Sequence, residues 1–343
     1  SYSLGILRWF LSRLKYWSWL GVLVIFIIPF VPKITNLSVI TGYFLIPLVL
    51  FTFIGAFYAA LLQGLQLFTW FSIIGILAVS LKLFGAVLVT LGIDGLLTIV
   101  FFLFLSFFIP LILSHKLITK HLLKSAHSHS YHIQKRVYQA LWSKQLIITL
   151  FSILAITMFN NIDVIYAKKI LSAHDAGIYS SWSLFAKIII YFVGPLSSIA
   201  YIFFSDKDNE KHQERVLFIS LALLVIIGFM SYIFYSVFSL FFIRFFFGPK
   251  YDSVAPFLTQ ASIFGSLYAL VTFMNNYFIS KNSMRALLLL FAMPVYIIAL
   301  ITISKSMSNI IMLNVIFAAI VTLAYFIACV TPFIYNSNHG KKK

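Results

Sequence analysis

Charge and cysteine are what this sequence has little of. Of its 343 residues only 10% are Asp, Glu, Lys or Arg, whereas 62% are hydrophobic. Charged residues make up about a quarter of a soluble domain, so this composition excludes a soluble globular protein. A lone cysteine, Cys329, excludes an internal disulfide and a cysteine-based metal site. What remains is a membrane protein that crosses the bilayer many times.

Acidic residues are scarcer still, because 8 Asp and Glu stand against 25 Lys and Arg. Such an excess suits nucleic acid only where it gathers on a water-exposed domain, and no stretch is long and polar enough to form one. The pattern GxxxxGK[ST] is absent as well, which argues against ATP as a direct energy source. The basic residues instead indicate how the chain crosses the membrane.

Apolar runs of bilayer-spanning length recur along the chain and predict an all-α, polytopic fold. A basic, polar linker at 115–145 divides the chain into an N-terminal bundle, 1–114, with four spans and a C-terminal bundle, 146–343, with six. The ten expected spans are 16–31, 37–62, 67–91, 95–114, 146–167, 177–203, 216–240, 254–279, 284–303 and 309–334.

The distribution of Lys and Arg predicts the orientation. With residues 1–15 in the cytoplasm, seventeen Lys and Arg lie on the cytoplasmic side and six on the outer side, while Lys82 and Lys187 fall within spans. Positive charge collects on the cytoplasmic side of membrane proteins. We therefore expect a multi-pass protein of the cytoplasmic membrane with the 115–145 linker inside and the 250–252 loop outside.

Two consecutive spans each carry a line of polar residues. Helical geometry places those of the first span within about 80° of one another, and they are Gln145, Thr149, Ser152, Asn160 and Asp163. The line on the second span consists of Ser180, Ser183, Lys187, Tyr191, Gly194, Ser198 and Tyr201. Polar and ionisable residues inside a membrane face the bundle interior or a water-filled cavity. The two lines predict the walls of a substrate cavity.

The same region resembles a known family. The runs Asn161-Ile-Asp163 and Asp175-Ala-Gly177-Ile-Tyr179-Ser180, together with Lys187 and Gly194-Pro195, resemble the seventh and eighth helices of the lipid-linked oligosaccharide flippases. These are the Wzx-type polysaccharide-biosynthesis branch of the multidrug/oligosaccharidyl-lipid/polysaccharide exporter superfamily. The run from Phe247 to Tyr251 is similar to the loop ahead of that family's tenth helix.

This resemblance implies an exporter-type fold and a function. The protein would flip undecaprenyl-pyrophosphate-linked oligosaccharide to the outer leaflet for O-antigen or another cell-surface polysaccharide. Two bundles would provide alternating access, driven by a proton or sodium gradient or the membrane potential. It would be a transporter rather than an enzyme, with no cofactor and no nucleic-acid partner, working beside membrane lipids and other polysaccharide-assembly proteins. The family has six helices in each bundle, so the first two are expected to be missing here.

Lys187 is the leading candidate for substrate binding. An ammonium at mid-membrane depth suits a pyrophosphate, because the attraction between opposite charges is stronger where the dielectric constant is low. Ser180, Ser183 and Tyr191 would then bind sugar hydroxyls. Lys82 also lies near the middle of its span, beside small residues that indicate a face packed on protein or a lumen. Its alternative role is structural pairing with a carboxylate.

Asp163 lies near the outer end of its span and leaves several roles open. It is a solvated interfacial carboxylate, a partner of Lys187, or the carrier of a coupling proton or sodium ion. Asn160 precedes it by one turn on the same line. In a later span Tyr268, Thr272 and Asn276 share a face, which predicts either a further polar wall or a helix-packing contact.

Two other groups of residues invite simpler interpretations. The histidines of the linker lack nearby Cys, Asp or Glu to complete a metal site, so no metal is expected; they are His115, His121, His127, His129 and His132. Arg244 is expected to anchor a lipid headgroup.

Two rival functions are weighed against the flippase. A drug/cation antiporter of the same superfamily should place more carboxylates in its cavity than Asp163 alone. A membrane polysaccharide polymerase or ligase needs a sizeable outer loop with Arg, His or carboxylate groups, whereas the outer loops expected here are short.

Overall fold

The protein is an all-α membrane protein, as the sequence predicted. The computed structural model describes residues 45–65, 67–93, 95–124, 143–205, 210–303 and 305–339, and these contain helices but no strand. In these ranges nine helices are long and apolar enough to cross a membrane. The first expected span, 16–31, and the part of the second before residue 45 lie outside the described residues.

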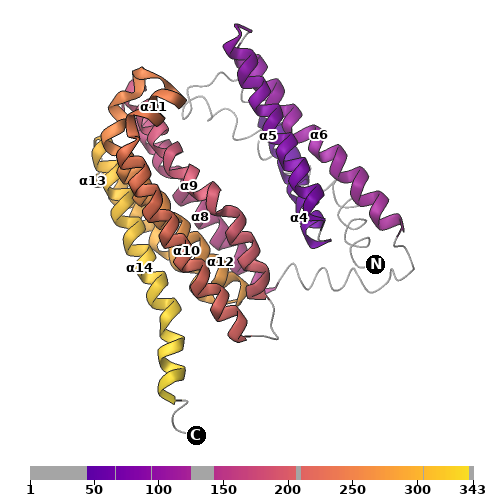
Figure 1. The fold of residues 1–343 in the computed structure, drawn as a ribbon, viewed down its shortest axis with the longest axis vertical. Coiled ribbons are helices and arrows are strands. Elements are labelled where there is room, and N and C mark those ends of the chain that lie inside the picture. The colour runs from indigo at the N-terminus through magenta and orange to yellow at the C-terminus, as the bar shows by residue number, and fades with distance from the viewer. Residues whose placement is uncertain are drawn as a thin grey trace. The chain divides into compact units, whose positions relative to one another are not determined.

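The chain divides into two compact units, residues 1–141 and 142–343, which are described separately. The described part of the first unit consists of α4 (Leu45–Gly64), α5 (Phe68–Thr90) and α6 (Gly95–Lys124), and α6 contacts both other helices (Figure 1).

Helix α6 continues to Lys124, which corrects the expectation that the span ends at 114 and a linker begins at 115. Packing explains the extension, because Ile118 is fully buried in a cluster with Tyr58 and Leu62 of α4. The Tyr58 hydroxyl also lies 2.7 Å from His115 Nδ1. His115 and His121 are therefore helical, whereas His127, His129 and His132 lie outside the described residues.

The second unit contains six long helices joined by short elements. In chain order, the elements are α8 (Lys144–Ile170), α9 (Ala173–Ser205), α10 (Glu210–Val237), the short α11 (Ser239–Phe247) and η2 (Pro249–Phe257), α12 (Leu258–Ser280), the short η3 (Met284–Leu287), α13 (Leu288–Ile303) and α14 (Met307–His339). Local sequence accounts for the breaks. Ser143 caps α8 by accepting a hydrogen bond from the Leu146 amide, and Gly248, at φ +80°, ends α11 just before Pro249.

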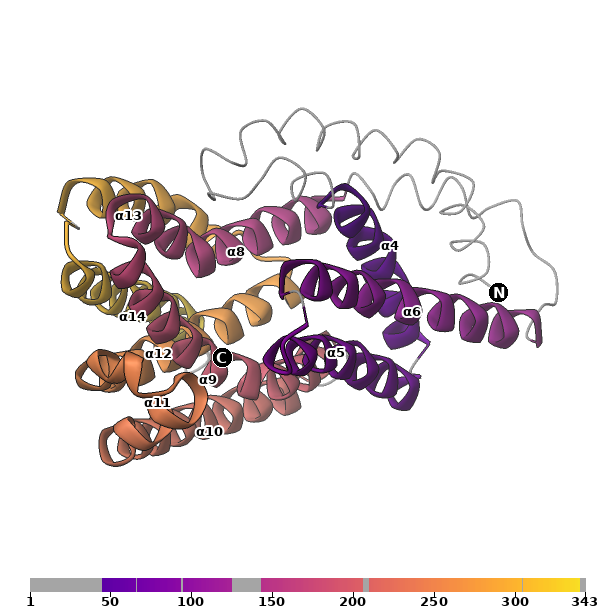
Figure 2. The same ribbon diagram turned by 90° about the horizontal axis from the view of Figure 1, so that it is seen from above.

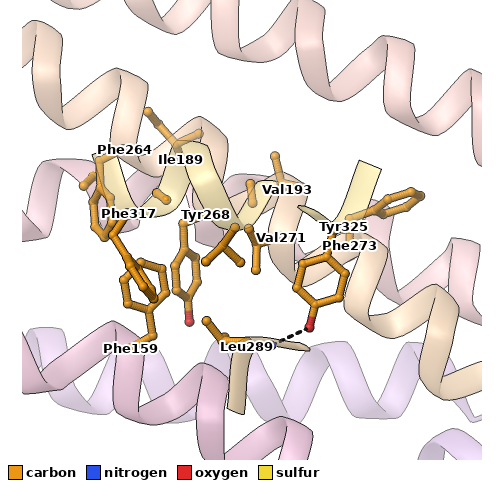
Figure 3. Packing of buried hydrophobic residues seen from close by; sticks show 14 of the residues in the cluster. Phe159, Ile189, Val193, Phe264, Tyr268, Val271, Phe273, Leu289, Phe317 and Tyr325 are labelled. Atoms are coloured by element: carbon orange, nitrogen blue, oxygen red, sulfur yellow. Dashed lines mark hydrogen bonds between the residues drawn. The ribbon is translucent and has the colours of Figure 1, made fainter. Parts of the chain in front are cut away.

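Helix α12 is the centre of the second unit. It contacts α8, α9, α10 and α14, and Figure 2 shows it between α10 and α14. Figure 3 shows the aromatic residues that pack around Tyr268 of this helix, with Phe159 from α8 and Phe317 from α14. The Tyr268 hydroxyl donates to the Ile156 carbonyl oxygen at 2.8 Å, so the one polar atom of this side chain is satisfied inside the core.

Helices α12 and α9 approach each other closely at Gly265. A Cβ atom there would lie 2.4 Å from the carbonyl oxygen of Ala186. That oxygen belongs to the backbone, so the two helices would have to separate to admit a methyl group. Small residues permit such close approach between membrane helices.

We expect Gly265→Ala to destabilise the second unit by about 1–3 kcal/mol, the usual cost of overpacking a close-packed interior. The temperature at which the detergent-solubilised protein loses its monodisperse chromatographic peak should fall. Gly75→Ala is the control, because a Cβ atom at Gly75 of α5 has nothing within 4 Å. Equal midpoint temperatures for both variants would contradict the close contact.

Candidate functional site

A pocket of about 300 Å³ lies between α9 and α12 in the second unit. The sequence placed Tyr191 and Ser198 on one polar line and Thr272 and Asn276 on another, and the structure brings all four together. The lining residues are Ile190, Tyr191, Val193, Gly194, Ser197, Ser198, Ala269, Thr272 and Asn276. The polar line of α9 and the polar face of α12 thus meet at a single pocket.

The side chains of this pocket offer hydrogen-bond acceptors, an amide and an aromatic ring. The Ser198 hydroxyl donates to the Gly194 carbonyl at 3.1 Å, and the Thr272 hydroxyl donates to the Tyr268 carbonyl at 2.9 Å. Both oxygens therefore keep lone pairs that can accept from a ligand. Tyr191 is 68% exposed. No carboxylate is among the lining residues.

Lys187 lies one helical turn from Tyr191 on α9 and is half-buried, but it does not line the pocket. It interacts electrostatically with Asp163. The two are not in direct contact, since the described residues contain one ion pair within 4.0 Å, and that pair joins Arg244 and Asp252. The Lys187 ammonium therefore has no carboxylate within ion-pair distance in the described part of the chain.

The other two serines of the α9 line, Ser180 and Ser183, do not line the pocket. The Ser180 hydroxyl donates to the Ala176 carbonyl of its own helix at 2.7 Å. Ser183 is buried, and its Oγ atom has no hydrogen-bond partner in the described structure. Ser183 therefore has unused hydrogen-bonding capacity one turn before Lys187.

Part of the polar line of α8 is buried rather than lining a water-filled wall, which corrects the sequence expectation for that part. Ser152 and Asp163 are both buried, on the same face as the apolar Ala155 and Phe159. Ser152 donates to the Ala286 carbonyl at 2.9 Å. These two residues turn inward because partners on other helices bind their polar groups, whereas Gln145 is exposed and Thr149 bonds to its own helix. The pattern of one helix does not reveal such partners.

Asp163 is the centre of a buried hydrogen-bond network. The Tyr179 hydroxyl donates to Asp163 Oδ2, and Asn314 Nδ2 donates to the same oxygen at 3.1 Å and to the Tyr179 hydroxyl oxygen at 2.7 Å. The Tyr296 hydroxyl donates to Asn314 Oδ1. Helices α8, α9, α13 and α14 each supply one residue of this Asp163 network.

One oxygen of the network is left open. Asp163 is 1% exposed, and its Oδ1 atom is buried without a hydrogen-bond partner among the described residues. The interpretation of Asp163 as a solvated interfacial carboxylate is therefore wrong. Asn160, one turn earlier, also has a buried oxygen without a described partner. Both side chains can accept a further hydrogen bond or contact a cation.

Sequence reasoning missed Tyr179, Tyr296 and Asn314 as members of this network. Asn314 had a usable signal, because it interrupts an otherwise apolar part of the last span, and a polar side chain at that depth needs a partner. Tyr179 and Tyr296 gave no such signal, because an aromatic residue in a membrane helix is as compatible with simple packing as with a hydrogen-bond network.

Lys82 belongs to the first unit. It is exposed there, and its Nζ atom lies 4.9 Å from the centre of the Phe107 ring. It borders a pocket of about 290 Å³ that also contains Thr52, Ser106 and Ser114. No described carboxylate lies within ion-pairing distance of it, and no group of metal-ligating side chains occurs in the described ranges.

Comparison with known proteins finds no family model, no curated protein and no solved structure that matches this chain.

Proposed function

We propose that the protein translocates a lipid-linked oligosaccharide across the membrane by alternating access. The observation that carries this proposal is the polar pocket between α9 and α12, two helices of membrane-spanning length, with Lys187 one turn before Tyr191 on α9. An open polar surface on membrane-spanning helices has a high cost in lipid, so it suits a polar ligand. The resemblance of Asn161–Asp163 and Asp175–Ser180 to the flippases supports the same function.

The chemistry of the pocket fits a glycan joined to an anionic group. Ser198 and Thr272 keep acceptor lone pairs for sugar hydroxyls, and the exposed ring of Tyr191 offers an apolar surface to the carbon face of a sugar ring. Lys187 provides a positive charge for the pyrophosphate. The absence of a carboxylate from the lining disfavours a cationic drug as the ligand, because such a ligand needs an anionic partner.

The Asp163 network supports a role in energy coupling. An open carboxylate oxygen inside four packed helices can take up a proton or contact a sodium ion. Either event changes the charge of the network, and so favours one arrangement of these helices over another. We propose that Asp163 carries the coupling ion.

We expect Tyr191→Leu and Thr272→Val each to lower export by about tenfold, since the loss of about 1.4 kcal/mol of binding corresponds to that factor. The measurement is surface polysaccharide in cells that lack the chromosomal copy, at equal membrane abundance of each variant. Polysaccharide that is unchanged on deletion of the gene would refute the proposed function itself.

Matched controls separate the pocket from general effects on the helices. Thr302→Val removes a hydroxyl that donates to its own helix in the same way as that of Thr272, at a position outside the pocket. Tyr232→Leu removes an exposed tyrosine from α10. Both controls should export normally. If they lose as much export as the pocket variants, the pocket is not the binding site.

A further inference from the structure

A second pocket, of about 490 Å³, lies at the α11 end of the second unit. Elements α10, α11, η2 and α12 all contribute to it, and none of its residues belongs to the pocket between α9 and α12. The lining residues are Tyr235, Ser236, Ser239, Leu240, Asp252, Ala255, Pro256 and Thr259. We call it the α11 pocket. In Figure 1, α11 lies at one end of this unit.

One of the lining residues, Asp252, belongs to an ion pair. The Arg244 side chain is bidentate on Asp252, with Nε 3.1 Å from both carboxylate oxygens and Nη2 2.7 Å from Oδ2. This hydrogen bond and the carboxylate charge raise the pKa of Arg244, so the guanidinium stays protonated. Arg244 Nη1 has no hydrogen bond to a described residue, and the Arg244 side chain is 58% exposed. The pair therefore presents both a free donor and a carboxylate.

The pocket itself is rich in hydrogen-bond acceptors. Ser236 donates its hydroxyl proton to the Ile233 carbonyl at 2.8 Å and keeps its lone pairs for another partner. Ser239 and Thr259 form no side-chain hydrogen bond with described residues, so their oxygens are also available. With the Asp252 carboxylate these groups match a ligand that has several donors on one small, positively charged group.

The surroundings of the pocket are typical of a membrane surface. Helix α11 lies between the candidate spans His212–Val237 and Pro249–Ser280. Its outward face is aromatic, since Phe241, Phe245 and Phe246 are 61%, 71% and 57% exposed. Aromatic side chains beside an arginine are typical of helices that lie at the boundary between headgroups and acyl chains.

We propose that the α11 pocket binds the phosphoethanolamine headgroup of a phospholipid in the adjacent leaflet. The phosphate would contact the free donors of Arg244, the ammonium would donate to Asp252 and the serine and threonine oxygens, and the acyl chains would lie along the phenylalanines of α11. The Arg244–Asp252 ion pair has no net charge, and neither does this headgroup. Each charge of the headgroup therefore meets the opposite charge of the ion pair. A choline headgroup has no N–H donor for these acceptors, and a glycerol headgroup leaves the phosphate charge uncompensated.

The test is lipid binding by the purified protein, which is independent of export. Delipidated protein is titrated with phosphatidylethanolamine, phosphatidylcholine and phosphatidylglycerol of identical acyl chains, and bound lipid is counted by native mass spectrometry. We expect phosphatidylethanolamine to bind about tenfold more tightly than the other two, because only it satisfies both charges and the acceptors. Equal affinities, or tighter binding of phosphatidylglycerol, would overturn the proposal.

Variants of the pocket locate the binding. Asp252→Asn should remove the preference for phosphatidylethanolamine, and Thr259→Val, which leaves the ion pair intact, should weaken binding several-fold. Lys250→Gln is the control, because Lys250 is an exposed cation of the same segment that does not line the pocket. If Thr259→Val binds as the unaltered protein does while Lys250→Gln does not, the headgroup is held elsewhere.

Discussion

Replacement of Lys187 by glutamine is expected to abolish export of the lipid-linked oligosaccharide while the protein keeps its normal level in the membrane. Glutamine keeps most of the length of the side chain but removes the positive charge that the pyrophosphate would meet at low dielectric. We expect export in a flippase-deficient strain to fall by more than tenfold. Lys187→Arg should retain part of it, because the charge remains but the shape of the donor group changes.

A double variant tests whether Lys187 serves only to neutralise Asp163, and restored export would also rule out the coupling role proposed for Asp163. If Lys187 served only to balance that carboxylate, Lys187→Gln combined with Asp163→Asn would leave no unpaired charge and would restore export. The structure argues against this outcome, since the two groups interact without an ion-pair contact and Asp163 has its own partners in Tyr179 and Asn314. We expect the double variant to stay inactive. Normal export by the single Lys187→Gln variant would contradict both substrate binding by Lys187 and its neutralisation of Asp163.

The positions of the spans that the structure describes followed from the sequence because long apolar runs have one stable arrangement in lipid. A segment such as 284–303 must satisfy every backbone group within itself, so it forms a helix, and the structure has helical elements over those residues. The residues at which the helices begin and end were less predictable. The extension of α6 to Lys124 depends on tertiary contacts of Ile118 and His115 with Tyr58, which leave no periodic trace in the sequence.

The candidate site was only partly predictable, and the polar lines of α8 and α9 illustrate the reason. A line on one helix shows that a polar face exists but does not show whether it meets water or other polar side chains. Tyr191 of α9 is exposed at a pocket, whereas Asp163 of α8 is closed in by Tyr179 and Asn314. The difference arises from residues up to 151 positions apart in the chain. Pairing at such a distance cannot be inferred from the spacing within either helix.

Asp163→Asn is expected to uncouple export from its driving gradient without unfolding the protein. The amide has the size of the carboxylate and retains an oxygen that can accept from Tyr179, but it has no charge to bind a proton or a sodium ion. Gradient-driven export should fall by more than tenfold. Export measured with a sodium gradient alone and with a pH gradient alone identifies the ion, because the unaltered protein responds to the one that Asp163 carries. Asp175→Asn is the control, since Asp175 is an exposed carboxylate hydrogen-bonded to Ser172.

Asp163→Leu separates the coupling role of this carboxylate from its structural role. Leucine removes the acceptor as well as the charge, so the Tyr179 hydroxyl and the Asn314 amide lose a buried partner, which costs about 1–3 kcal/mol for each group left unsatisfied. The thermal midpoint in detergent should therefore fall for Asp163→Leu and change little for Asp163→Asn, although both variants lose coupled export. If Asp163→Asn were destabilised as much as Asp163→Leu, and its export fell only in proportion to its abundance, the network would serve packing alone. The proposed coupling ion would then have to bind elsewhere.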